Sequence, residues 1–293
     1  MKLVWAFNPF DVNRKLQQRA LAILQAIAGP RDSLEAVYVA SPMEVALATA
    51  FDVPLAIRYS GHPQRLVEQG LRKLGLKRAV ATVLTEDTLS LSAAARTLVS
   101  HAAHRQADIT LVASHARKGV PRLFIGSFAE TLVHLSKTDL LVFRETTRTS
   151  KGAPKHLLYA HDLSRAGDRG FERALLHAKR WKSALHVIHV PEPAFGIRFD
   201  DQDPRVDTYR RQVKKKIEAI ESRLKRSGVR GSVAIDAQWA PISELVLAHA
   251  KRVHADLVLV TAKSGPLASL MGGSVTRQIL RTSAAPVLVV KVS

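Results

Sequence analysis

The sequence predicts an α/β protein in which one unit, an open parallel sheet flanked by helices, occurs twice. Short apolar runs alternate with helical patterns along the chain, which is typical of a parallel sheet covered on both faces. The second half repeats the order of features of the first. A polar segment rich in Ser, Thr, Gly and Pro, RETTRTSKGAP at 144–154, separates the halves.

The starts of the two halves correspond. KLVWAFNPFD (2–11) and KHLLYAHDLS (155–164) are each a short apolar strand that ends in polar residues. Both are followed by a predicted helix and then a second apolar strand: helices over 13–28 and 165–182, strands over 34–40 and 184–190. Between 210 and 230, apolar residues recur at helical spacing with basic residues between them, which predicts a helix with a solvated basic face.

The ends of the halves repeat even more closely. Residues 106–145 and 254–293 each give Ala-Asp, an apolar run, a basic Gly/Pro loop, Gly-Ser, a helix and a final apolar run. The Gly-Ser lies 18 residues after Asp108 in the first half and 17 residues after Asp256 in the second. This near-constant offset predicts a duplication, with domains at 1–148 and 152–293.

The final apolar runs, 140–143 and 286–290, are expected to pair with each other, because an open strand edge favours a partner. Such pairing would relate the two domains by a pseudo-twofold axis and give an intramolecular pseudo-dimer. Whether two chains pair further into a homodimer is left open.

Composition excludes several classes of protein. The 293 residues contain no cysteine, so disulfides, thiolate zinc sites and thiol catalysis are excluded. No run reaches the roughly 18 apolar residues of a transmembrane helix, and the first residues predict a strand and not a signal peptide, so we expect no membrane span and a cytoplasmic protein. The net charge of +19 would attract anions of any kind without choosing among them.

Each Gly-Ser pair stands directly before a predicted helix. The exposed N–H groups of a helix start carry partial positive charge and suit an anion, and a glycine lets a ligand approach the backbone closely. A simple helix cap explains the same pattern, so this feature alone leaves cap and phosphate site as alternatives.

The order of strand-Asp, LHVIHV, ADLVLV, Gly-Ser-helix and APVLVVK resembles the universal stress protein family, and in particular a tandem member with two fused domains. The resemblance covers essentially the whole chain and is most specific over GGSVTRQILRTSAAPVLVVK at 272–291. It implies open five-stranded parallel sheets, Rossmann-like and similar to adenine-nucleotide alpha-hydrolases. It also implies that members that bind an adenine nucleotide hold it across the carboxyl ends of the strands.

The nucleotide-binding pattern of that family, Gly-x2-Gly-x9-Gly-[Ser/Thr] with an Asp after the first strand, survives only in part. In the second domain Asp162 stands at the Asp position beside His161, and Val260 and Lys263 replace the two earlier glycines. Lys263 could block the site or reach a phosphate as a point charge. The helix start expected to face phosphate is formed by Gly273, Ser274, Val275 and Thr276.

The first domain departs further from the family pattern. Asn8 stands at the Asp position, Ala113 and Ala116 replace the earlier glycines, and Gly126 and Ser127 precede the helix. We expect this domain to serve assembly more than ligand binding. The segment 190–207 is interpreted either as a lid over the second-domain site or as an ordinary loop, and 41–75 as the lining of a cavity or a dimer contact.

The sequence thus predicts a non-catalytic ligand-sensing module of the stress response with a degenerate nucleotide site in its second domain. ATP, another adenine nucleotide or another small phosphorylated compound is the expected ligand, with magnesium only alongside ATP. No catalytic or metal-binding residues are expected, and the expected macromolecular partners are proteins and not nucleic acid. The alternatives are a slow ATPase using Asp162 and His161, and an interaction scaffold that binds proteins or, through its charge, nucleic acid.

Overall fold

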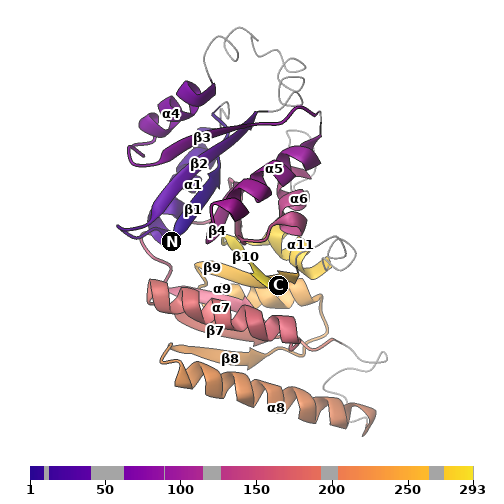
Figure 1. Cartoon of the computed structure of the whole chain (residues 1–293). Coiled ribbons are helices and arrows are strands. Elements are labelled where there is room, and N and C mark those ends of the chain that lie inside the picture. Colours follow the sequence, from indigo (N-terminus) through magenta and orange to yellow (C-terminus); the bar gives the residue numbers. More distant parts are fainter. Residues whose placement is uncertain are drawn as a thin grey trace.

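The two halves of the chain form one continuous sheet of ten strands in the order β3-β2-β1-β4-β5-β10-β9-β6-β7-β8 (Figure 1). The structure is a computed structural model and describes residues 1–9, 13–40, 63–88, 90–114, 127–192, 204–263 and 274–292. Within each half all strand pairs are parallel, while β5 and β10 are antiparallel. The predicted class, two repeated parallel sheets flanked by helices, is confirmed.

The same order of strands and helices is present in both halves. The N-terminal strands are β1 (Lys2–Ala6), β2 (Ser33–Ala40), β3 (Val80–Thr85), β4 (Ile109–Ala113) and β5 (Asp139–Phe143). The helices of this half are α1 (Arg14–Ile27), α4 (Pro63–Lys73), α5 (Leu91–His104) and α6 (Ser127–Leu135). The C-terminal strands are β6 (His156–Ala160), β7 (Ala184–His189), β8 (Gly231–Ile235), β9 (Leu257–Lys263) and β10 (Val287–Val292). Its helices are α7 (Arg165–Trp181), α8 (Pro204–Arg226), α9 (Ile242–Arg252) and α11 (Ser274–Thr282).

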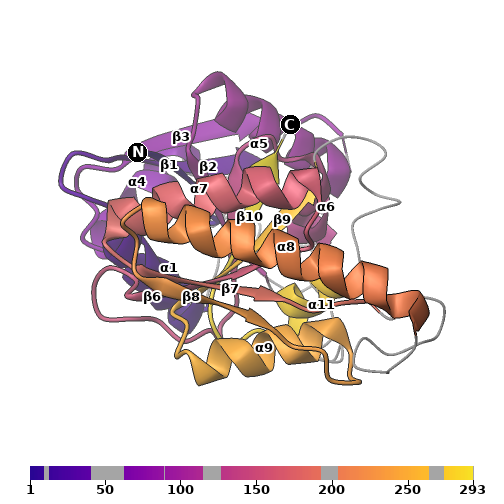
Figure 2. The same ribbon diagram turned by 90° about the horizontal axis from the view of Figure 1, so that it is seen from below.

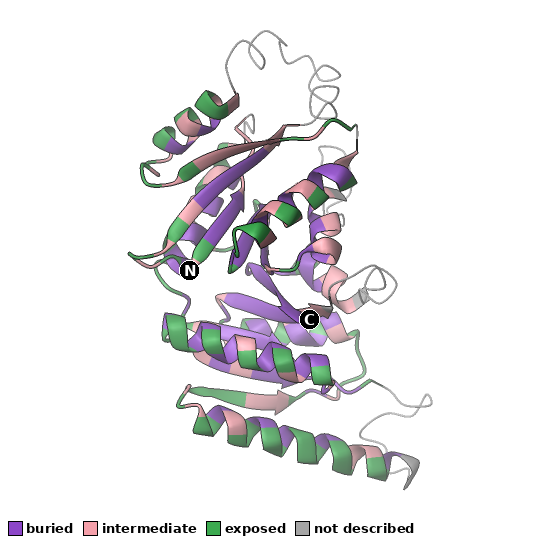
Figure 3. Ribbon diagram, viewed as in Figure 1, coloured by how far each residue is buried: buried purple, intermediate pink, exposed green. Residues whose placement is uncertain are grey.

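The helices form two layers, one on each face of the sheet. Apolar side chains of α1, α4, α7 and α8 pack in one buried cluster, and those of α5, α6, α9 and α11 pack in another. Successive strand residues such as Leu157 and Leu158 point to opposite clusters, as the pleat requires. The inner strands are largely buried, the edge strands β3 and β8 are half-buried or exposed, and the helices expose their outer sides (Figure 3). No helix in the described part of the chain has the length and apolar character needed to cross a membrane.

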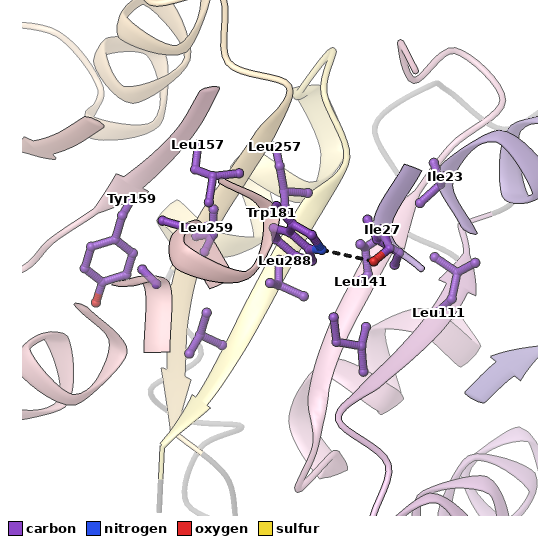
Figure 4. Close-up of a cluster of buried hydrophobic side chains, with 14 of the residues drawn as sticks. Ile23, Ile27, Leu111, Leu141, Leu157, Tyr159, Trp181, Leu257, Leu259 and Leu288 are labelled. Atoms are coloured by element: carbon purple, nitrogen blue, oxygen red, sulfur yellow. Dashed lines mark hydrogen bonds between the residues drawn. The ribbon is translucent and has the colours of Figure 1, made fainter. Parts of the chain in front are cut away.

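The contact between the halves is centred on the antiparallel pair of terminal strands, as the sequence predicts. Val287 pairs with Val142, Leu288 with Leu141 and Val289 with Leu140. The predicted pairing of the apolar runs is therefore confirmed, and Leu141 and Leu288 lie opposite each other at its centre. The indole Nε1 of Trp181 on α7 also donates to the carbonyl of Ile27 on α1 at 3.0 Å, which joins the helix layer across the same boundary (Figure 4).

A buried charge cluster lies at this boundary. Asp139, fully buried at the start of β5, accepts hydrogen bonds from Arg173 Nη2 at 2.7 Å, His177 Nε2 at 2.9 Å and the Lys291 backbone N–H at 3.0 Å. Burial alone would raise the pKa of Asp139, but the hydrogen bonds from His177 and Arg173 and the Arg173 charge outweigh it and hold the pKa below its ordinary value. Asp139 therefore stays ionised at neutral pH and stabilises the docking of α7 against β5.

Two cations cross the boundary in a symmetric manner. Arg144, directly after β5, donates through Nη2 to the carbonyl of Ser283 at 2.5 Å, just beyond the end of α11. Lys291, near the end of β10, donates through Nζ to the carbonyl of Val133, in the last turn of α6. A cation near the carbonyls of a helix end is favourable because they carry partial negative charge. Each half thus supplies a cation to the carbonyl end of the last helix of the other half.

We expect Asp139→Asn to destabilise the protein at pH 7 by about 3 kcal/mol, because it removes the buried carboxylate to which Arg173 and His177 donate and leaves these donors without an ionised partner. A group whose folded-state pKa is depressed contributes stability above its unfolded pKa, about 3.9 for Asp, and this contribution is lost as the pH falls through the folded value. The difference between wild type and variant should therefore shrink below about pH 4. Urea denaturation followed from pH 7 to pH 3 measures it.

The control for this prediction is Asp207→Asn, because Asp207 is exposed and pairs with Arg210 at 3.4 Å on the surface of α8. Its unfolding midpoint should change little. An Asp139→Asn gap of the same size at pH 7 and at pH 3 would show that the cluster contributes packing and not charge.

Candidate functional site

The carboxyl ends of β6 and β9 form the candidate site of the C-terminal half. Strand β6 lies between β7 and β9, so the chain first adds β7 and β8 on one side of β6 and then returns to place β9 on the other. In open parallel sheets, ligands bind in the crevice at such a switch point, outside the carboxyl ends of the strands. Asp162 follows β6 there, and Lys263 ends β9. The corresponding point of the N-terminal half lies between β1 and β4.

Backbone hydrogen bonds define which residues of the two halves correspond. The Phe7 N–H donates to the carbonyl of Val37 at 2.9 Å, and the His161 N–H donates to the carbonyl of Ile188 at 2.9 Å. Each bond continues the parallel pairing of the first two strands by one residue. Phe7 therefore corresponds to His161, and Asn8 corresponds to Asp162.

Asp162 is exposed and held by the turn that begins α7. Its Oδ1 accepts hydrogen bonds from the Ser164 N–H at 3.0 Å and from the Ser164 hydroxyl at 2.7 Å. Ser164 in turn caps the helix, since its Oγ accepts from the Gly167 N–H at 3.0 Å. The turn thus fixes the direction of the carboxylate at the mouth of the switch point.

Two glycines let α7 approach the strand ends closely. A Cβ at Gly167 would come too close to Asp162 Oδ1 and within 3.0 Å of the His161 ring. A Cβ at Gly170 would collide with the hydroxyl groups of Thr261 and Tyr159. Those hydroxyls are hydrogen-bonded to each other at 2.6 Å, and Tyr159 donates to the carbonyl of Gly167 at 2.6 Å. The first turns of α7 are therefore fixed against both β6 and β9.

His161 is buried beneath the start of α7, with 1% of its side chain exposed. Its Nδ1 accepts a hydrogen bond from the Leu163 N–H at 2.9 Å, so the ring proton is on Nε2. Burial lowers the pKa of His161 to about 4, although Asp168 and Asp162 act in the opposite direction. At neutral pH the ring is uncharged, and the lone pair on Nδ1 is occupied by the hydrogen bond from the Leu163 N–H.

Basic groups from α8 surround this turn. Lys216 Nζ donates to the carbonyl of Leu163 at 2.8 Å. Arg223 pairs with Asp168 at 2.7 Å and Glu172 at 2.5 Å, and its guanidinium lies 5.0 Å from the centre of the Phe171 ring. His189, at the end of β7, donates through Nδ1 to the carbonyl of His161 at 2.9 Å, and burial lowers its pKa, so it too is uncharged at neutral pH.

The remaining site residues predicted from sequence fall into three groups. Val260 is buried within β9, so its side chain packs in the core, while Val275, Thr276, Asn8 and Ala113 are half-buried. For three residues only the backbone position is described: Lys263 is the last residue of β9, Ser274 the first of α11 and Ser127 the first of α6. Ala116, Gly126 and Gly273 lie outside the described residues, as do 193–203 of the lid segment and 41–62 of the segment 41–75.

Sequence reasoning missed Gly167, Gly170, Tyr159 and Thr261, which hold α7 against the strand ends. A signal for them exists in RAGDRGFERA, because two glycines three residues apart inside a helix cost helix stability and indicate close packing. The described ranges contain no group of three or more His, Asp or Glu side chains arranged to hold a metal ion.

The comparisons with known proteins agree with this geometry. The model of the universal stress protein family matches twice, over residues 9–144 and 154–291. A search of curated protein sequences found no significant match. Among solved structures, a universal stress protein from Archaeoglobus fulgidus DSM 4304 is similar over 99% of this chain and 96% of its own, with a TM-score of 0.65 and 17% identity.

Two further solved structures are similar. A putative universal stress protein from Pseudomonas aeruginosa UCBPP-PA14 covers 99% of this chain with 92% of its own, at a TM-score of 0.60 and 15% identity. A universal stress protein from Archaeoglobus fulgidus solved with dAMP covers 47% of this chain with 97% of its own, at a TM-score of 0.36 and 14% identity. The two family matches span nearly the whole chain, which therefore belongs to the universal stress protein family and carries two units of it in tandem.

Proposed function

We propose that the chain is a cytoplasmic, non-catalytic regulatory module that senses an adenine nucleotide, or another small phosphorylated compound, in its C-terminal domain, residues 152–293. The N-terminal domain, 1–148, lacks a competent site and serves assembly. The observation that carries the proposal is the difference between two equivalent positions. An exposed carboxylate, Asp162, follows the first strand of one half beside the switch point and is held by Ser164, whereas the other half has Asn8 at that position.

The nucleoside end of the ligand is assigned to Asp162. Its Oδ1 is occupied by Ser164, which leaves acceptor capacity on the carboxylate for a ribose hydroxyl or another donor. A hydrogen bond to a charged acceptor contributes about 1.5–3 kcal/mol to the free energy of the interaction, roughly twice the contribution of a hydrogen bond between neutral groups. Gly167 and His161 support this end by holding the turn and do not contact the ligand themselves.

The phosphate end is assigned to the first turn of α11. This helix runs from the carboxyl end of β9 back to the start of β10, so Ser274, its first residue, lies at the carboxyl edge of the sheet. The N–H groups of its first turn, at Ser274, Val275 and Thr276, have no partner within the helix and suit an anion, and a glycine at position 273 would permit close approach. Lys263 at the end of β9 adds a cation for a phosphate, with magnesium needed only when the ligand is ATP.

The non-catalytic part of the proposal is supported by His161. A general base needs a free lone pair near a water molecule and a pKa close to the working pH. His161 has neither, because Leu163 occupies Nδ1 and burial lowers the pKa to about 4. Of the two groups that a slow ATPase would need here, only Asp162 is exposed.

Asp162→Ala should weaken ligand binding at least tenfold, since about 1.4 kcal/mol corresponds to a factor of ten and a charged hydrogen bond exceeds that value. Native mass spectrometry of the purified protein first identifies any bound ligand. Calorimetric titration with that ligand, or with ATP and magnesium, then gives the affinity. The matched control is Asn8→Ala at the equivalent position of the other half, which should bind as wild type does.

Ser274→Trp should abolish the same binding, because an indole at the first residue of α11 fills the space in front of its N–H groups. Ser127→Trp, at the first residue of α6, is the control and should leave binding unchanged. Equal losses in both variants would show that ligand binds in both domains, and wild-type protein that is empty and indifferent to ATP would overturn the proposal.

Phosphate release from ATP should proceed at the same background rate in wild type and Asp162→Ala. A coupled phosphate assay over several hours with magnesium present measures it. Faster release by wild type that Asp162→Ala removes would make the chain a slow ATPase.

A further inference from the structure

The positive charge of the protein is concentrated on one of its two helix layers. The layer of α1, α4, α7 and α8 contains 20 Lys and Arg against 6 Asp and Glu. The opposite layer of α5, α6, α9 and α11 contains 5 Lys and Arg against 2 Asp and Glu. Two such layers on opposite faces of one sheet give the molecule a strongly basic side and a nearly neutral side.

Helices α7 and α8 form the centre of the basic side. They lie side by side in Figure 2, and Arg223 of α8 bridges to Asp168 and Glu172 of α7. Figure 1 shows the same two helices from the side, with the end of the sheet behind them. Both carboxylates of α7 are therefore paired with Arg223. Other cations are exposed along the outer sides of the two helices. The basic face is defined here as Arg165, Arg169, Lys179, Arg211, Lys215 and Arg226.

The cations of the basic face are available to a partner. Within the described part of the chain, none of the six forms an ion pair with a carboxylate, and all six are exposed. Their spacing keeps them on one side of each helix: Arg165 and Arg169 are four residues apart, as are Arg211 and Lys215. A helix of 23 residues such as α8 extends about 34 Å, so the face is long as well as dense in charge.

We propose that the basic face binds the phosphate backbone of double-stranded DNA without reading its sequence. Duplex DNA carries one negative charge per about 1.7 Å of helix axis, and its non-specific binding is supplied by Lys and Arg that release counterions. Phosphate contacts carry no sequence information directly. The basic segment 210–230 by itself predicts a solvated helix face, and the structure adds a second basic helix beside it.

The chemistry of the face favours this partner over other polyanions. A bilayer surface requires a broad apolar face to insert, but Leu176, 64% exposed, is the one large apolar side chain exposed on the described parts of α7 and α8. Single strands are held by stacking on aromatic rings, and protein partners need an apolar core at the interface. Duplex RNA is recognised mostly by its shape and by contacts to 2′-hydroxyls and phosphates across its wide minor groove, so the test below compares it directly with DNA.

The test uses the full chain and a fluorescent 24-base-pair DNA duplex, with anisotropy measured over a series of salt concentrations. The variant Arg169→Gln, Lys179→Gln, Lys215→Gln removes three charges from the basic face. The matched control Arg96→Gln, Lys137→Gln, Lys251→Gln removes the same residue types and charge from exposed positions in α5, in the loop after α6 and in α9. Thermal melts of both variants confirm that they are folded.

Wild type and the control should bind the duplex alike, with a logarithmic affinity that falls linearly with the logarithm of salt concentration. The variant of the basic face should bind more than tenfold more weakly at about 100 mM salt, with a slope reduced by about 3, since each lost contact removes about 0.9. Addition of ATP should leave the curves unchanged, so this outcome is independent of the proposed nucleotide site.

Four results would overturn the proposal. Equal weakening in both triple variants would show that total charge, and not this face, attracts DNA. If wild type did not bind the duplex at 50 mM salt, the protein would not be a DNA-binding protein. Binding of a duplex RNA of the same sequence, or of vesicles containing phosphatidylserine, without binding of the DNA would assign the face to that partner instead.

Discussion

The backbone pairing of β5 with β10 is the constraint on which the rest of the molecule depends. Each half ends in an apolar strand whose N–H and C=O groups would otherwise form an open edge. Joining the two edges makes one sheet of ten strands and fixes the two helix layers on common faces. The buried cluster around Asp139, the Trp181 to Ile27 bond and the cations at the ends of α6 and α11 all lie where this pairing brings the halves together.

Within the C-terminal half, the candidate site and the basic face occupy different parts of the surface. Asp162 follows the carboxyl end of β6, beside that of β9, whereas the basic face lies on the outer sides of two helices that pack on one face of the sheet. Beside the turn after β6, Lys216 from α8 donates to the Leu163 carbonyl and Arg223 from α8 pairs with Asp168. The long basic helix therefore has two sides, one that supports the candidate site and one that is exposed.

Much of the fold follows from the sequence because duplication doubles every signal. The strand runs, the helix after each Gly-Ser and the pairing of 140–143 with 286–290 were all predictable from apolar periodicity. The candidate site was predictable only in outline. Asp162 was found because it stands at the Asp position of the family that the sequence resembles. The burial of His161 depends on α7 and α8 packing over it, and no local pattern encodes that. The contacts of Gly170 with Tyr159 and Thr261 join residues that are 11 and 91 positions apart, so their geometry appears only in the folded chain.

The Asp139 cluster has a consequence for the history of the chain. Counting from the central pair Leu141 and Leu288, the counterpart of Asp139 is Pro286. Counting from the helix caps Asn13 and Ser164, the counterparts of Arg173 and His177 are Ala22 and Ala26. Two identical separate chains would necessarily place the same residues on both sides of such an axis. An acid that meets its bases at only one of the two equivalent contacts can therefore arise only after the sequences of the two copies have diverged, and once present it makes the halves complementary and no longer interchangeable.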